Sequence, residues 1–285
     1  MQEPLFAEVL AEAERALRSQ GRAALCQIVR AEGSTPGKAG WKMLVRPDGS
    51  VVGNLGGGAF EALVQADARA KLREPQPSAE VKRYYFTEEA VRGEPTGMVC
   101  GGFAEVFLEV LVAAPLLVVC GGGPVGQAVA RAAQVAGFDT LVVEDREEYL
   151  RPELFPPDTR LARVSRDYRE PFLEPVRGRD LYAAVVTRCW ETDAAALGGL
   201  LGQRPERLRY LGLLGSRRKI ARVRSVLAER GFRADASGSG FAGIDCGFHA
   251  PIGLPIGGDS PGEIAISILA EVVQARNAVA ELARA

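Results

Sequence analysis

The residues best placed to do chemistry in this sequence are glycines that follow an apolar run. Gly121, Gly122, Gly123 and Gly126 come directly after 116–120, in the pattern Gly-x-Gly-x-x-Gly. The first glycine of this pattern allows a tight turn, the second lets a phosphate approach the backbone, and the third lets helix and strand pack closely. The N–H groups that begin the next helix would face the anion. The turn therefore predicts a phosphate-bearing ligand, with a tight turn that binds nothing as the alternative.

Two acidic residues stand where a dinucleotide site would place its ribose-binding carboxylate. Glu144 and Asp145 end the strand predicted over 140–143, about 20 residues after the glycines. An acid in this place favours NAD over NADP. It can also be a strand end that only contacts solvent.

A basic cluster follows the apolar run 211–214. Gly215 and the good N-cap Ser216 precede Arg217, Arg218 and Lys219. Cations in the first turn of a helix oppose its dipole, by about 0.3–1 kcal/mol each. A bound anion would reverse that effect. The alternative is that these side chains extend into solvent or pair with acids.

A second glycine turn opens a helix predicted over 59–73. Gly56, Gly57 and Gly58 precede this helix, and Glu61 lies in its first turn. Backbone N–H groups in such a turn can hold an anion or a carboxylate. Equally, Glu61 can cap its own helix.

Cys100 is embedded among glycines, directly before Gly101 and Gly102. A cysteine with so little steric cover is a candidate for a ligand-facing or sulfur-handling thiol. A lone cysteine is also commonly a small hydrophobic residue.

The loop 33–40, with the sequence GSTPGKAG, carries hydroxyls and a cation, and Lys42 follows it. Such a loop could close over a ligand. A long connection between two strands is at least as good an explanation.

The histidine and cysteine content excludes several kinds of site. The five cysteines are scattered and form no Cys-x-x-Cys pair, and His249 is the single histidine. A disulfide framework, a structural zinc site and a histidine-based metal cluster are therefore not expected. We expect His249 to be structural rather than a catalytic base.

The alternation of strands and helices after Pro115 predicts the scaffold that positions these residues. We predict an α/β protein with a C-terminal Rossmann-like parallel-sheet domain, residues 114–285, and a smaller N-terminal α+β domain, residues 1–113. The predicted C-terminal strands are 116–120, 140–143, 161–164, 183–187 and 209–214, and the helices are 125–136, 193–201, 216–230 and 263–282. In the N-terminal domain we predict helices 5–19 and 59–73 and strands 23–29, 41–45, 51–54, 81–86 and 103–112. The glycine-rich stretch 232–258 is predicted to be a long loop.

The composition is that of an ordinary soluble protein. The chain has 285 residues, of which 47% are hydrophobic and 25% charged, with a net charge of −1. This charge argues against nucleic acid or an anionic membrane as the main partner. The N-terminal segment predicts an amphipathic helix rather than a signal peptide, and no apolar run approaches about 18 residues. We expect a cytoplasmic protein.

Taken in order, these motifs resemble the XdhC/CoxI family of xanthine dehydrogenase accessory proteins. The resemblance covers nearly the whole chain, through the segments 33–61 and 97–102, the glycine turn 121–126 with 142–149, and the segments 210–223 and 250–273. It implies an N-terminal XdhC/CoxI domain and a C-terminal Rossmann domain. It also implies a cytoplasmic, typically dimeric accessory protein rather than a free-standing enzyme.

The same resemblance implies a chaperone for molybdenum cofactor (molybdopterin). Such a protein supports cofactor sulfuration with a cysteine desulfurase and delivers the cofactor to a molybdenum hydroxylase such as xanthine dehydrogenase. The cofactor's phosphate is expected at 121–126 or at 216–219. Its pterin and metal are expected toward 56–58 and Cys100.

The chain departs from the family pattern in two places. Ala59 stands where the family often has Cys, and Trp190 stands where it often has His. The first difference removes a possible contact between thiol and cofactor and leaves Cys100 as the thiol embedded in glycines.

Two other functions remain open on the sequence. One is an NAD(P)-dependent oxidoreductase that uses the Rossmann turn with a Lys or Tyr as proton donor. The other is a regulatory module that binds a nucleotide without turning it over.

Overall fold

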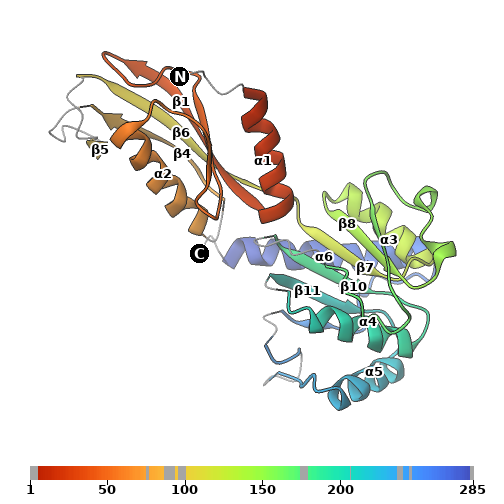
Figure 1. Ribbon diagram of the computed structural model, residues 1–285. Helices are drawn as coiled ribbons and strands as arrows, with labels where there is room; N and C mark the ends of the chain where they lie inside the picture. The colour runs from red at the N-terminus through yellow and green to blue at the C-terminus, as the bar shows by residue number, and fades with distance from the viewer. Residues whose placement is uncertain are drawn as a thin grey trace. The chain divides into compact units, whose positions relative to one another are not determined.

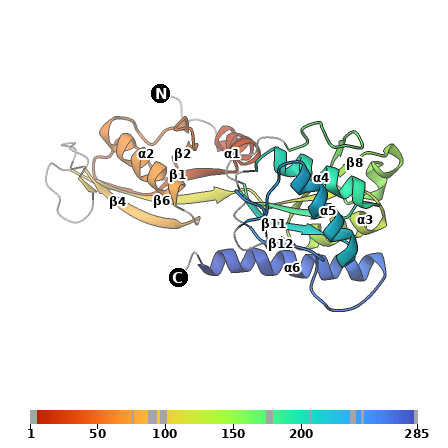
Figure 2. The same cartoon turned by 90° about the horizontal axis from the view of Figure 1, so that it is seen from below.

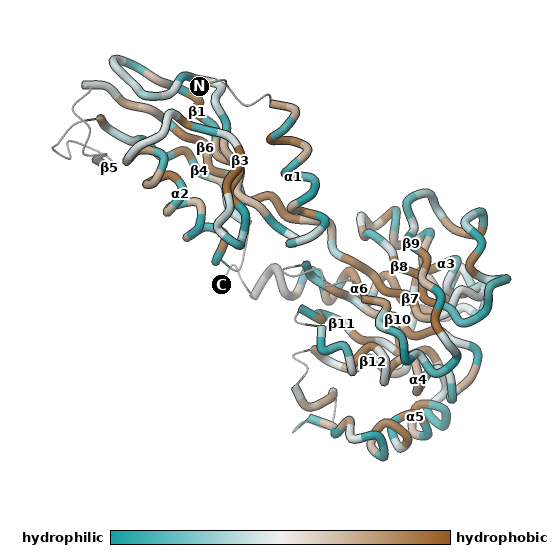
Figure 3. Tube along the Cα trace, in the orientation of Figure 1, coloured by the Kyte–Doolittle hydropathy of each residue, from teal (hydrophilic) through white to brown (hydrophobic). Residues whose placement is uncertain are grey.

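The computed structural model of the protein describes residues 6–74, 77–86, 94–95, 101–173, 179–205, 207–235, 240–243 and 246–282. The chain forms two compact units (Figure 1). Unit 1 contains the described residues up to Ala113, and unit 2 contains those from Ala114 onward. Figure 3 shows that hydrophobic residues concentrate in the central strands of each unit. No helix among the described residues is long and apolar enough to cross a membrane.

Unit 1 is a mostly antiparallel sheet with one helix on each face. The strand order is β3-β2-β1-β6-β4-β5, and only β4 and β5 pair in parallel. The strands are β1 (Arg22–Glu32), β2 (Lys42–Val45), β3 (Val51–Gly53), β4 (Ala79–Tyr85), β5 (Glu94–Pro95) and β6 (Phe103–Val112).

Neighbouring residues of β1 point to opposite faces of this sheet, which explains how both helices find an apolar partner. Ala24, Cys26 and Ile28 belong to the core under α2 (Gly58–Arg73). Ala23 instead packs with α1 (Phe6–Gln20), through Val9 and Ala13 among others. Cys26 is fully buried in the core under α2, and its burial raises the pKa of its thiol to about 12.

Unit 2 has the predicted parallel sheet, with six strands in the order β12-β11-β10-β7-β8-β9. The strands are β7 (Leu116–Cys120), β8 (Asp139–Glu144), β9 (Arg160–Arg163), β10 (Leu181–Val185), β11 (Leu208–Leu213) and β12 (Phe248–His249). Numbered along the chain within the unit, the order is 3-2-1-4-5-6, the doubly wound arrangement of dinucleotide-binding folds. The prediction of an α/β protein with a Rossmann-like C-terminal part is confirmed.

Two helix layers cover this sheet, which is why its central strands are apolar throughout. Helices α3 (Pro124–Val135) and α6 (Pro261–Leu282) share one core with the sheet. Helices α4 (Trp190–Gly202) and α5 (Arg217–Glu229) share the other. Figure 2 shows α6 along one face of the sheet. Two short 3₁₀ helices, η1 (Glu147–Tyr149) and η2 (Pro152–Leu154), follow β8.

The prediction of a long loop over 232–258 is wrong in one respect. It contains the strand β12, whose Phe248 and His249 pair with Leu211 and Gly212 of β11. Two residues are too few to show a strand period, so only the neighbouring strand reveals them. A second difference is at α4, which begins at Trp190 rather than at Asp193.

Candidate functional site

In unit 1, the loop 33–40 packs backbone to backbone on the first glycine turn. A side chain at Gly37 would place its Cβ 2.1 Å from the carbonyl oxygen of Leu55. A Cβ at Gly56 would lie 2.6 Å from the carbonyl carbon of Pro36. Real Cβ atoms do not approach other atoms so closely, so these glycines are required for the two loops to meet.

The segment 101–102 joins the same group of loops. A Cβ at Gly33 would lie 2.7 Å from the carbonyl oxygen of Gly101, and one at Gly102 would lie 2.4 Å from that of Glu32. The N–H of Gly101 donates to the carbonyl oxygen of Phe86 at 2.9 Å, which anchors the segment to the end of β4. We call residues 33–37, 55–58 and 101–102 the glycine cluster. Cys100 lies outside the described residues, directly before this cluster.

Glu61 organises the glycine turn of this cluster. Its Oε2 accepts from the N–H of Leu55 at 3.0 Å and from that of Gly57 at 3.1 Å. Gly56, Gly57 and Gly58 all have positive φ, a conformation open to glycine at little cost. At these N–H groups the structure therefore shows the capping alternative, and an anion would have to compete with Glu61. Ala59 is exposed on the first turn of α2.

In unit 2, the carboxyl ends of β7, β10 and β11 lie next to one another because these strands are adjacent and parallel. This is the switch point where open α/β sheets bind ligands. The third glycine of the turn acts as predicted, since a Cβ at Gly126 would lie 1.8 Å from the oxygen of Gly121. Gly123 has nothing within 4 Å of its Cβ position and is open. Glu144 is 2% exposed and accepts from Gly122 N–H at 2.8 Å.

An ion pair with a buried carboxylate joins α4 and α5, the helices that follow β10 and β11. The Nζ of Lys219 lies 2.5 Å from Oδ2 of Asp193, as an ion pair without hydrogen-bond geometry. Asp193 is fully buried, and its Oδ1 accepts from the hydroxyl of Thr187 at 2.6 Å. Burial raises the pKa of Asp193, and contact with the Lys219 ammonium partly offsets that rise. Of the alternatives for Lys219, the structure shows pairing with an acid.

The other residues of the basic cluster lie at the start of α5. Ser216 caps the helix by accepting from the N–H of Lys219 at 3.3 Å. A Cβ at Gly215 would lie 2.8 Å from the Cδ of Lys219, so a side chain there would displace the lysine. Arg217 and Arg218 are exposed, and neither has an ion-pair partner in the described part of the chain. These two guanidinium groups are available to an anion.

The segment 187–193 contributes residues to this edge that the sequence did not single out as a site. Cys189 is the N-cap residue of α4, and its Sγ lies 3.3 Å from the hydroxyl of Thr192. The guanidinium of Arg222 lies over the Trp190 ring, with its Cζ 4.9 Å from the ring centroid. A sequence signal was present, because polar residues directly after a buried strand fall at the carboxyl edge of the sheet. The contact of that segment with 215–219, through Asp193 and Lys219, could not be seen in the sequence.

His249 belongs to a structural contact rather than to this edge. Its Nδ1 lies 2.9 Å from Oε1 of Glu271, whose Oε2 accepts from Tyr210 at 2.5 Å and from Gly253 N–H at 2.7 Å. Burial, then the hydrogen bond to Glu271, raises the pKa of the Tyr210 phenol. Glu271 thus holds β11, β12 and the following loop to α6.

Replacing Glu271 by alanine should lower the free energy of unfolding by about 2–3 kcal/mol, because buried partners lose their acceptor. Urea denaturation followed by circular dichroism measures this change. Gln274→Ala, at an exposed position of the same helix, is the control and should change the stability by less than about 0.5 kcal/mol. Equal effects of the two substitutions would show that Glu271 has no such role.

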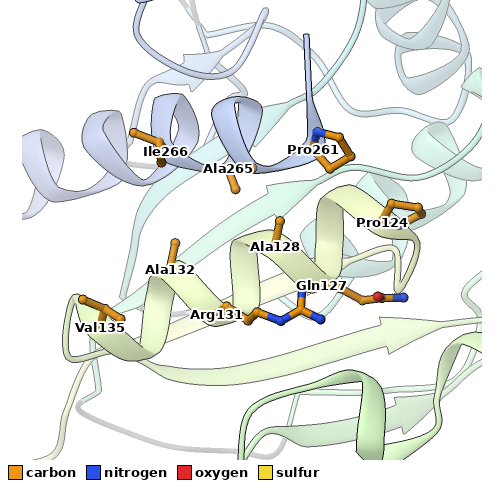
Figure 4. A pocket seen from close by; sticks show the side chains of 10 residues that line it. Pro124, Gln127, Ala128, Arg131, Ala132, Val135, Pro261, Ala265 and Ile266 are labelled. Carbon is orange, nitrogen blue, oxygen red and sulfur yellow. The ribbon is translucent and has the colours of Figure 1, made fainter. Parts of the chain in front are cut away.

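A groove between α3 and α6 is a separate feature of unit 2 (Figure 4). Its walls are mostly small or apolar side chains, and Arg131 is the one ionisable residue among them. Among the described residues, no group of three or more His, Cys, Asp or Glu side chains could hold a metal ion. The two candidate sites are therefore the glycine cluster of unit 1 and, in unit 2, the carboxyl edge of the parallel sheet.

Comparison with known proteins matches both units to one family. Residues 117–272 match the family described as the XdhC Rossmann domain, and residues 8–85 match the XdhC and CoxI family. A curated Escherichia coli K12 protein, "Uncharacterized protein YqeB", is 37% identical over 259 residues, covering 89% of this chain and 43% of that protein. A probable xanthine dehydrogenase component from Bacillus subtilis 168 is 31% identical over 176 residues, covering 61% of this chain and 47% of that protein.

This chain spans less than half the length of both curated relatives. A crystal structure described as a xanthine dehydrogenase from Bacillus halodurans superimposes with a TM-score of 0.46 at 21% identity. That alignment covers 94% of this chain and 96% of the other.

Proposed function

The chain belongs to the XdhC and CoxI family, and on this premise we propose that it is an accessory protein of a xanthine dehydrogenase-type molybdenum hydroxylase. It binds the molybdenum cofactor of that enzyme as cargo. The name of the Bacillus subtilis relative supports the choice of client enzyme. The family resemblance supports a cytoplasmic homodimer that works with a cysteine desulfurase in cofactor sulfuration and insertion.

The observation that carries the proposal is the glycine cluster of unit 1. Three segments far apart in sequence meet there through glycines that leave no room for side chains. Pterins are recognised through the polar edge of a flat ring, which suits exposed backbone N–H and C=O groups. Gly33, Gly58 and Gly101 are exposed and belong to this cluster.

Unit 2 carries a separate candidate site for a phosphate, at the start of α5. Arg217 has no partner among the described residues, and Ser216 offers a hydroxyl at the same helix end. Charge-assisted hydrogen bonds from guanidinium to phosphate are among the strong polar contacts in proteins. Lys219 is already paired with Asp193, so we assign phosphate binding to Arg217 and Ser216 rather than to Lys219.

Retention of free cofactor tests the proposal. Purified protein is mixed with molybdenum cofactor without oxygen and ultrafiltered, and retained molybdenum and pterin are quantified with and without excess NADH. We expect about one cofactor per chain that NADH does not displace. If the cofactor is not retained and NADH binds saturably, this proposal is overturned in favour of an NAD(P)-dependent oxidoreductase.

Cys100 gives a residue-specific test of the same function. Cys100→Ser should lower cofactor retention, because a thiolate is a far better ligand for an oxidised metal than a hydroxyl. Cys246→Ser, elsewhere in the chain, should leave retention unchanged. If Cys100→Ser retains as much cofactor as the unmodified protein, the thiol has no part in binding.

A further inference from the structure

A dinucleotide places three demands on the turn of a Rossmann unit. The acid at the end of the second strand must be free to accept the ribose hydroxyls, and the N–H groups of the turn must be free for the pyrophosphate. The surface around the turn must also leave room for the adenosine. In unit 2 these demands fall on Glu144, on the glycine turn, and on η1 after β8.

The carboxylate of Glu144 has no acceptor site left for a ribose. Its Oε2 accepts from Gly122 N–H at 2.8 Å and from Arg146 Nη2 at 3.2 Å. Its Oε1 accepts from the N–H groups of Asp145 and Arg146, both at 3.2 Å, and from Arg146 Nε at 3.0 Å. An ionised carboxylate has about four lone-pair sites. Five donors from the protein therefore saturate Glu144.

The space beside the turn is filled by backbone. A Cβ at Gly122 would lie 2.6 Å from the carbonyl oxygen of Tyr149, the last residue of η1. The guanidinium of Arg146 lies 4.0 Å from the centre of the Tyr149 ring. Gly122 thus accommodates the chain's own backbone, in the region where the turn would otherwise face adenosine.

The second acid and the nearby cations are also engaged. Asp145 accepts two hydrogen bonds from Arg188, at 2.7 and 2.8 Å. This contact holds the pKa of Asp145 below its usual range, so the pair stays charged. NADP requires a cation for its 2′-phosphate, but Arg146 and Arg188 each already contact a carboxylate.

We infer that Glu144, Arg146, Tyr149 and Arg188 fill the adenosine and ribose position of this turn, so that it binds neither NAD nor NADP. The glycines instead let the chain pack against itself at Gly121, Gly122 and Gly126. This inference does not depend on the proposed function. It rules out this turn as the nucleotide site of an oxidoreductase, and it says nothing about other parts of the chain.

Equilibrium dialysis with NADH, NADPH and AMP tests the inference on the full chain. We expect no saturable retention of any of them up to about 1 mM. The decisive variant is Gly123→Val, because this glycine has ordinary backbone angles and open space at its Cβ position. Retention by the unmodified protein that Gly123→Val abolishes would overturn the inference. Retention that survives Gly123→Val would place the nucleotide elsewhere and agree with a filled turn.

Amide hydrogen exchange gives a positive readout of the same arrangement. The N–H of Gly122 is bound to a buried carboxylate, so it should exchange at least about 100-fold more slowly than a free amide. NADH should not change that rate, and Glu144→Ala should raise it at least about tenfold. Fast exchange of Gly122 in the unmodified protein, or protection that appears only when NADH is added, would show that the turn awaits a ligand.

Discussion

Replacing Lys219 by methionine is expected to lower the free energy of unfolding by about 3 kcal/mol at neutral pH. The substitution leaves the carboxylate of Asp193 fully buried without a cation, with the Thr187 hydroxyl 2.6 Å from its Oδ1. An unpaired buried charge is much more costly than the pair it came from. Urea denaturation at pH 7 measures the loss.

Two further variants separate this ion pair from general effects of the basic cluster. Arg218→Met removes an exposed cation from the same helical turn and should change the stability by less than about 0.5 kcal/mol. Adding Asp193→Asn to Lys219→Met removes the stranded charge and should restore at least about half of the lost stability. If Lys219→Met is no more harmful than Arg218→Met, the pair does not stabilise unit 2.

The pH dependence of this loss has a definite sign. Burial raises the pKa of Asp193, so the folded protein binds this proton more tightly than the unfolded chain. The bound proton stabilises the folded protein at low pH. This contribution is lost as the pH rises from about 3.9, the usual pKa of aspartate, through the raised pKa of Asp193. Removing Lys219 raises the pKa further. The difference between Lys219→Met and the unmodified protein should therefore be smaller at pH 5 than at pH 7.

Replacing Gly37 by alanine is expected to disrupt the glycine cluster and, with it, cofactor retention. The new Cβ would lie 2.1 Å from the backbone oxygen of Leu55, and backbone cannot move aside as a flexible side chain can. We expect a loss of about 3 kcal/mol in stability, at the upper end for overpacking. Retention of molybdenum cofactor should fall at least about tenfold, measured in the ultrafiltration assay.

Gly40→Ala is the matched control in the same loop. Gly40 has a φ of 96°, but no atom lies within 4 Å of its Cβ position. Alanine there introduces backbone strain of about 1–2 kcal/mol without a steric clash, so retention should stay near that of the unmodified protein. Equal loss of retention in both variants would mean that loop strain, rather than contact between the loops, controls binding.

The sequence alone determined the alternation of strands and helices in unit 2 and the approximate positions of most of its elements. An unbroken apolar run predicted the buried strand β7, and Pro124 begins α3 as a first-turn proline does. Ser260 and Glu263 have the Ser-x-x-Glu spacing of a capping box, and they form its reciprocal bonds at 3.0 and 3.3 Å. These features depend on residues at most a few positions apart, so local periodicity and capping chemistry are sufficient to find them.

Only the tertiary structure decided which distant groups meet. The acid that pairs with Lys219 is Asp193, on another helix, and Glu144 turns inward to the glycine turn rather than toward solvent. The glycines of 33–37, 55–58 and 101–102 form one cluster because the sheet of unit 1 brings their loops together. Spacing along the chain shows which residue types are present. The order of the strands and the packing of their loops determine which of those residues come into contact, and that arrangement belongs to the whole fold.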